Sequence, residues 1–135
     1  MRETDVAYLA GIIDGEGSIM LNKYHKSEYP APCIAVSSSD LELLEWIKNL
    51  IQAGRINKKK NYNPEKHKTS YTYSLYYNRA IEIMELIEPY LVIVRKKKRA
   101  QHIVKYYKDV TVRNGRYNAE QKKAKENFYV EFLEI

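Results

Sequence analysis

The chain has 135 residues, of which 44% are hydrophobic and 30% charged, and a net charge of +6. This length suits one globular domain over residues 1–135, and it is too short for two. No run is apolar enough to cross a membrane, and the single cysteine, Cys33, excludes both an internal disulfide and a zinc site built on cysteines.

The basic excess favours a polyanionic partner. A lone cysteine is also typical of a reducing, intracellular compartment, such as a bacterial cytoplasm or an organelle. The N-terminus is charged and carries no apolar signal region, which agrees with that expectation.

The stretch from Tyr8 to Ile19 reads YLAGIIDGEGSI and begins as a buried helix, which Thr4 is expected to cap. Ala7, Gly11 and Gly15 recur every four residues, so they lie on one helical face. A glycine inside a helix costs about 1 kcal/mol relative to alanine. A face almost without side chains supplies the reason, because it lets a second backbone approach closely.

Two acids, Asp14 and Glu16, follow at the end of this helix, near Ile13, and alternate with Gly15 and Gly17. The glycines permit a sharp turn, so a carboxylate and a bare main-chain carbonyl can lie at one point. Hard cations such as Mg²⁺ prefer oxygen ligands of this kind. An ordinary acidic turn would explain neither the small-residue face nor the second acid.

Alternating residues then predict a strand up to about Lys26 and, after a turn at Pro30 and Pro32, a second strand over residues 33–37. Ser39 and Glu42 predict a capping box for an amphipathic helix. We expect that helix to end at Gly54, as a residue just beyond the C-cap.

Residues 55–61 and 69–77 are expected to form a second hairpin. Helices follow from Asn78 to about Glu88, over residues 92–108, and from Asn118 to the end of the chain. This order predicts the α+β class, with an antiparallel sheet made from two hairpins and with helices at the C-terminus.

The nine residues Leu9–Gly17, LAGIIDGEG, resemble the signature of the LAGLIDADG homing endonucleases. The predicted element order also resembles the αββαββα core of that family across nearly the whole chain. Family members with one motif copy are homodimers, and this chain has one copy. The resemblance therefore implies a homodimer built on the face of Ala7, Gly11 and Gly15.

The resemblance further implies a metal site. In the family, the last acid of the motif binds metal through its side chain and the preceding residue binds through its carbonyl, which are Glu16 and Gly15 here. The implied cation is Mg²⁺, with Mn²⁺ or Ca²⁺ as other possible occupants. The first acid, Asp14, corresponds to a structural position at the helix end.

Two further catalytic positions come from the resemblance. An active-site lysine corresponds best to Lys96, in the run Arg95–Arg99, with Lys97 and Lys98 as alternatives. Its role would be to stabilise the phosphate or to polarise the attacking water. Such a run is otherwise usually a solvated basic face. Ser38 is the nearest match to a polar residue that follows the second strand in the family.

The aliphatic residues of the strands predict which face of the sheet is outward. Ile19, Ile34 and Leu75 are expected to face the core, so the opposite phase is free for a partner. That phase is polar, basic and aromatic, as in a surface that reads a DNA groove, although an ordinary wet sheet face would look similar. The expected DNA contacts are Met20, Asn22, Tyr24, Lys26, Cys33, Ala35, Ser37, Asn57, Lys59, Thr72, Ser74 and Tyr76.

The function implied by the resemblance is a homodimeric, intron-encoded, Mg²⁺-dependent endonuclease that cuts both strands of double-stranded DNA at a long, nearly palindromic site. An RNA maturase or a non-catalytic DNA-binding regulator on the same scaffold is the alternative. Glu16 and the basic helix start favour the endonuclease, but a maturase can keep the acids, so the sequence leaves both open.

Overall fold

The computed structural model describes all 135 residues. The sequence folds into an α+β structure with one four-stranded antiparallel sheet in the order β1-β2-β4-β3. The elements are α1 (Glu3–Glu16), β1 (Gly17–Asn22), β2 (Ala31–Ser38), α2 (Leu41–Ile51), β3 (Arg55–Lys58), β4 (Tyr71–Tyr76), α3 (Tyr77–Ile87), η1 (Glu88–Tyr90), α4 (Val94–Tyr106), η2 (Lys108–Val110) and α5 (Ala119–Leu133). The predicted fold class and element order are confirmed.

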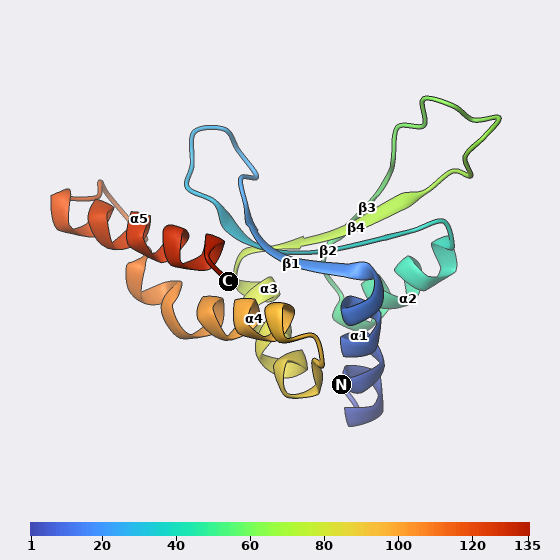
Figure 1. Cartoon of the computed structure of the whole chain (residues 1–135), viewed down its shortest axis with the longest axis horizontal. Helices are drawn as coiled ribbons and strands as arrows, with labels where there is room; N and C mark the ends of the chain where they lie inside the picture. Colours follow the sequence, from blue (N-terminus) through green and yellow to red (C-terminus); the bar gives the residue numbers. More distant parts are fainter.

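Figure 1 shows α1, α2, α3 and α4 on one side of the sheet, while the β1–β2 and β3–β4 loops rise on the other side. The sheet between these loops carries no helix, and α5 extends past the end of the sheet beside the β1–β2 loop. The chain therefore leaves one broad sheet face uncovered.

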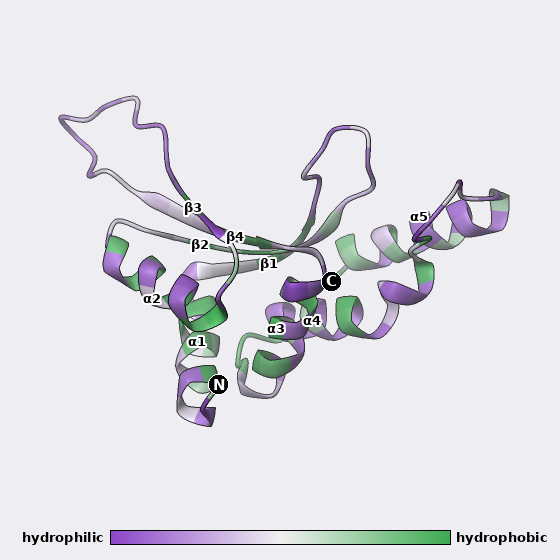
Figure 2. Ribbon diagram, turned by 180° about the vertical axis from the view of Figure 1, so that it is seen from behind, coloured by the Kyte–Doolittle hydropathy of each residue, from purple (hydrophilic) through white to green (hydrophobic).

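The strand register sorts the two faces of the sheet. Ile34 lies opposite Ile19 on one side and Leu75 on the other, and all three are buried. They join a single core of 22 buried residues to which the helices contribute Leu9, Ile13 and others. Figure 2 shows the corresponding apolar residues along the helices beneath the sheet. The predicted inward phase of these strands is confirmed.

Several predicted boundaries are wrong. The N-cap of α1 is Arg2 rather than Thr4, and α1 continues to Glu16, so both acids of the motif lie in its last turn. β1 ends at Asn22 and β3 at Lys58. Tyr24 and Lys26 therefore lie in a loop, whereas the Lys59 N–H still donates to the Ser70 carbonyl just beyond the strand.

The start and end of α2 also differ from the prediction. The N-cap is Asp40, whose N–H donates to the Ser38 hydroxyl, and no capping box forms at Ser39. The left-handed residue at the C-cap is Gln52, with φ 59°. Gly54, with φ 99°, is needed for a different reason, because a Cβ there would lie 2.5 Å from the Tyr73 ring. The start of β2 differs too, because Pro32 lies within this strand rather than in a turn.

The C-terminal helices agree better with the predicted boundaries. The helix α3 begins at Tyr77, one residue before the predicted cap Asn78. The predicted start of the last helix at Asn118 is confirmed, and Asn118 caps it, since its side chain accepts from the Gln121 N–H while the Gln121 side chain accepts from the Asn118 N–H.

Candidate active site and nucleic-acid interface

The acidic motif lies where α1 passes directly into β1. A Cβ on Gly17 would lie 2.7 Å from the Ile13 Cα, so only glycine allows this sharp turn. Glu16 is exposed in the last helical turn, and Gly15 beside it is also exposed. The Glu16 carboxylate and the Gly15 carbonyl therefore belong to an open helix end next to the uncovered sheet. Within one chain, no three His, Cys, Asp or Glu side chains gather into a metal-binding group.

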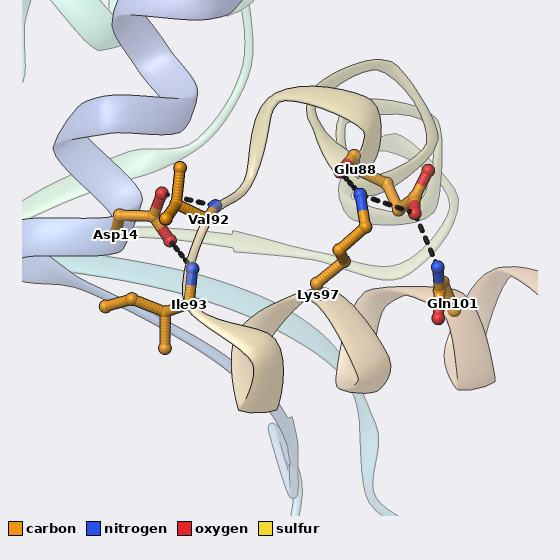
Figure 3. Close-up of polar contacts among 6 residues, drawn as sticks. All are labelled: Asp14, Glu88, Val92, Ile93, Lys97 and Gln101. Carbon is orange, nitrogen blue, oxygen red and sulfur yellow. Dashed lines mark hydrogen bonds and ion pairs between the residues drawn. The ribbon is translucent and has the colours of Figure 1, made fainter.

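Asp14 is committed to a structural contact. Its Oδ2 accepts a hydrogen bond from the Val92 N–H at 2.9 Å, and its Oδ1 accepts one from the Ile93 N–H at 3.1 Å (Figure 3). Both carboxylate oxygens are thereby used to fix the segment that leads into α4. These two hydrogen bonds explain the structural role predicted for the first acid of the motif.

Lys96 is the basic residue of the run that reaches the motif. Its Nζ donates to the Ile13 carbonyl at 2.8 Å and to the Asp14 carbonyl at 2.6 Å. Carbonyls in the last turn of a helix carry partial negative charge, which favours a cation there. Asp14 and Lys96 therefore bind α1 and α4 together through contacts in both directions.

The other two candidate lysines have different environments. The Lys97 Nζ donates to the Glu88 carbonyl at 2.8 Å and pairs with its carboxylate at 3.1 Å, while Gln101 also donates to that carboxylate (Figure 3). The hydrogen bond from Gln101, and then that from Lys97, lower the pKa of Glu88. Lys98 is exposed. Of the three alternatives, only Lys96 lies at the motif.

Ser38 is placed at the end of β2, two residues past the last β1–β2 pair, in which Gly17 lies opposite Val36. Its hydroxyl accepts from the Asp40 N–H at 3.0 Å, a bond that shapes the turn into α2. The side chain is half-buried and makes no hydrogen bond to the motif, so a catalytic role for Ser38 stays a prediction.

The uncovered sheet face carries most of the predicted DNA-contact residues. Across it, Ser37 and Thr72 share a hydrogen bond at 3.0 Å, and Asn22 Nδ2 donates to the Tyr76 hydroxyl at 3.2 Å. Cys33 is the exception, because it is 1% exposed and its burial raises the pKa of its thiol. Neighbouring side chains therefore cover Cys33, so it is not accessible for a DNA contact in this structure.

Two exposed residues of this face, Ser18 and Arg55, are not among the predicted DNA contacts. Ser18 lies opposite Ala35, and Arg55 lies opposite Ser74, so Arg55 shares the outward face with Asn57. The alternation that places Ile56 inward already implies this position for Arg55. A hollow of about 500 Å³ opens here, and it is lined by Tyr24, Ala53, Gly54, Arg55, Asn57, Ser74, Leu75, Tyr76, Tyr77 and Arg79.

The small-residue face of α1 points away from the core. Ala7, Gly11 and Gly15 are exposed, and the space where a Cβ of either glycine would stand has no neighbour within 4 Å. The opposite face of α1 is buried through Val6, Leu9, Ala10 and Ile13. The face is therefore free for another backbone to approach.

None of the helices is both long and apolar enough to span a membrane.

An acidic helix end beside an open, polar sheet in a basic chain suits a nucleic-acid partner. The profile of the LAGLIDADG endonuclease family matches residues 9–107. The chain therefore belongs to the LAGLIDADG endonuclease family, and the predicted endonuclease class is confirmed at the level of the family. No curated protein sequence matches the chain.

Solved structures of homing endonucleases share the fold. I-CvuI in complex with its target is 16% identical with a TM-score of 0.61, and the alignment covers 98% of this chain and 96% of that one. The archaeal, intron-encoded I-Vdi141I complexed with DNA is 16% identical with a TM-score of 0.55, covering 95% and 98%. I-GzeII in complex with a DNA target is 23% identical with a TM-score of 0.57, covering 77% of this chain but 36% of that one.

Proposed function

We propose that two copies of this chain together make a site-specific double-strand cut in DNA by metal-dependent hydrolysis of phosphodiester bonds. The observation that carries this proposal is the open end of α1, where Glu16 and Gly15 are exposed beside the uncovered sheet and directly adjoin a bare helical face. Packing two such faces would place two Glu16 side chains near one another, one for each DNA strand.

The coverage of the relatives supports the dimer. The chain spans nearly all of I-CvuI and I-Vdi141I, but only about a third of I-GzeII. A chain that matches one part of a longer homing endonuclease is expected to need a second copy to supply the other part.

The oxygen donors at the motif suit a hard cation. We propose that the Glu16 carboxylate and the Gly15 carbonyl hold Mg²⁺, for which Mn²⁺ or Ca²⁺ could substitute, since these donors are the kind that such ions prefer. Structures of the relative I-CvuI were obtained in the presence of Ca or Mg. A bound divalent cation neutralises phosphate charge and lowers the pKa of a water nucleophile.

The neighbouring side chains would complete the site. The Lys96 ammonium, fixed on the Ile13 and Asp14 carbonyls, would place a positive charge beside the scissile phosphate and stabilise the charge that develops there. We propose that Ser38 contributes through a water molecule, because its own hydroxyl is bonded locally.

Recognition of the target would use the uncovered sheet face. Asn22, Asn57 and Arg55 can form hydrogen bonds with base edges in the major groove. The β3–β4 loop, where Lys60, Lys66 and Lys68 are exposed, can take phosphates. The DNA would lie between the two loops that rise from the sheet in Figure 1.

Plasmid cleavage tests the proposal. With Mg²⁺ and a target from the uninterrupted allele of the host gene, we expect linear product from the unmodified chain and none from Glu16→Gln. DNA binding should stay nearly intact, because the amide keeps the shape and loses only the charge. The matched control is Glu131→Gln, an exposed acid on α5. Full cleavage by Glu16→Gln would overturn the metal-ligand assignment and favour a maturase or a regulator.

Gly11→Leu tests the dimer. A side chain at position 11 meets nothing within the chain, so the variant should fold as well as the unmodified protein. It should nevertheless sediment as a monomer and lose cleavage, because it separates the two helices. Ala124→Leu, at an exposed small residue of α5, should change neither property. A monomer for the unmodified chain at micromolar concentration would refute the homodimer.

A further inference from the structure

The bare face of α1 has two different flanks. An α-helix turns by about 100° per residue, so Tyr8 and Asp14, three positions before and after Gly11, lie roughly 60° to opposite sides of it. Figure 1 shows the same arrangement at the level of elements, with α1 between α2 and the start of α4. Any second copy that covers the bare face must also meet these flanks.

The flank beside Asp14 is aliphatic and exposed. Val92, Ile93 and Val94 are 81%, 42% and 62% exposed, which is unusual for three consecutive branched residues. Their backbone is fixed, because the Asp14 carboxylate accepts hydrogen bonds from the Val92 and Ile93 N–H groups and α4 starts at Val94. The exposed cation Arg95 follows directly. We call residues 92–94 the aliphatic segment.

The flank beside Tyr8 is aromatic and hollowed. Tyr8 is 58% exposed, and its ring packs edge to face on Trp46 of α2, with centroids 5.0 Å apart. A hollow of about 510 Å³ lies over this pair, and it is lined by Thr4, Asp5, Tyr8, Glu42, Leu43 and Trp46. Asp5 and Glu42 make its rim acidic in a chain that is basic overall. We call this feature the Tyr8–Trp46 hollow.

A two-fold axis brings unlike flanks together. Bringing the two Glu16 ends together requires an axis that runs roughly along α1. About such an axis, a point to one side meets the partner's surface to the other side, so each flank faces its opposite and not itself. We propose that, in the homodimer, the aliphatic segment of each copy docks into the Tyr8–Trp46 hollow of the other, with Arg95 against the acidic rim. The inference rests on the proposed homodimer and names the contacts that complete it.

The two flanks are complementary in chemistry as well as in position. Aliphatic side chains meet exposed aromatic rings, and a cation meets the carboxylates of Asp5 and Glu42. Within the chain, Asp5 has only the exposed Arg2 as an ionic partner, at 3.3 Å, and Glu42 forms no ion pair. The acidic rim therefore has capacity for a cation from a second copy.

This docking would act on the candidate active site. The aliphatic segment is hydrogen-bonded to Asp14, two residues from Glu16, and Lys96 at the start of α4 donates to the Ile13 and Asp14 carbonyls. A partner that binds the segment would therefore fix the position of Lys96 relative to the end of α1. Each site would thus be set by contacts from the other copy, in addition to the second Glu16.

Cysteine cross-linking tests the arrangement with little background, since the only native cysteine, Cys33, is buried. In the double variant Val92→Cys/Leu43→Cys, the two thiols of one chain lie on opposite flanks of α1 and should not meet. Each should meet its counterpart in the partner, so oxidation or a short bis-thiol reagent should give a covalent dimer. Neither single variant should cross-link, and Val130→Cys on α5, 53% exposed, serves as the background control.

Charge reversal gives a second, independent readout. Arg95→Glu should weaken dimerisation at least tenfold in sedimentation, and Glu42→Lys in the same chain should restore most of it. Lys98→Glu, an exposed lysine of α4, should have a smaller effect and should not be rescued. A dimer that persists without cross-links, or cross-links equally in the single variants, would overturn the docking alone. A monomeric unmodified chain would instead overturn the proposed homodimer.

Discussion

Two lysines of this chain are drawn inward without a carboxylate partner, and their surroundings differ. Lys96 is half-buried and donates to two main-chain carbonyls at the end of α1, at 2.8 and 2.6 Å. Lys125 of α5 is 5% exposed and donates once, to the Thr111 hydroxyl at 2.6 Å. The remainder of its ammonium faces the rings of Tyr107 and Tyr29, at 4.1 and 5.8 Å.

The difference shows how the same side chain serves two purposes. Carbonyl oxygens at the end of a helix carry partial negative charge, and two of them hold the Lys96 ammonium beside the acids of the motif. Aromatic faces and a single hydroxyl replace water less completely, and burial lowers the pKa of Lys125 to about 8. Lys96 is thus placed where a charge is useful for chemistry, whereas Lys125 packs α5 against the β1–β2 loop and the end of α4.

Of the substitutions that test this difference between the two lysines, replacement of Lys96 should have the largest effect, and that effect is on the cleavage rate. Lys96→Met should lower the cleavage rate by roughly 10²–10³-fold, because a fixed positive charge stabilises the transition state more than the bound substrate. DNA binding, measured on the same target, should change little. Lys98→Met is the matched control, since Lys98 is exposed in the same run. Equal losses in both variants would mean that the run acts only through its total charge.

A smaller effect is expected from the acid that supports Lys96. Asp14→Asn keeps the shape but turns an amide N–H toward one of the two main-chain N–H donors, of Val92 or Ile93. One donor is then left unsatisfied, which costs about 1–3 kcal/mol. We expect a lower midpoint in thermal unfolding, together with slower cleavage as α4 and Lys96 shift. An unchanged unfolding midpoint would contradict this role.

The sequence predicted the fold well because its strongest signals are local. The alternation in β1, β2 and β4 and the start of α5 at Asn118 depend on neighbouring residues, and both predictions are confirmed. Predictions about ends were weaker, because a cap competes with alternatives a residue or two away. At α2 the N-cap is Asp40 rather than Ser39, and the Ser38 hydroxyl accepts from the Asp40 N–H in the turn that leaves β2.

The candidate site was predicted in part, through the resemblance of the motif. The position of Lys96 followed from that resemblance, but its partners did not, because the carbonyls of α1 are 82 and 83 residues away in the sequence. Burial of Cys33 depends on side chains from other strands, so alternation alone placed it outward with its neighbours. Lys125 resembled any lysine of a polar helix face, and nothing in its sequence context distinguishes it from Lys122.

The smallest effect on cleavage is expected at Lys125, whose removal instead changes the dependence of stability on pH. Its pKa falls from 10.5 in the unfolded chain to about 8 in the fold, because burial disfavours the charged form. Between these values the unfolded chain binds more protons than the folded one, so the contribution of Lys125 to the free energy of unfolding rises with pH. The full rise is on the order of 3 kcal/mol, complete above the unfolded pKa and absent below about pH 8. Burial raises the pKa of Tyr73 and Tyr107, which adds a separate dependence of stability on pH. The quantity to measure is therefore the difference between the unmodified chain and Lys125→Met in denaturant unfolding at pH 7 and pH 10. We expect that difference to shift in favour of the unmodified chain at pH 10, while Lys122→Met, at an exposed position of α5, gives a constant difference.

Cleavage at neutral pH should stay within a few-fold of normal in Lys125→Met, in contrast to Lys96→Met. A large loss of cleavage there would show that α5 takes part in the reaction and would end the distinction between the two lysines.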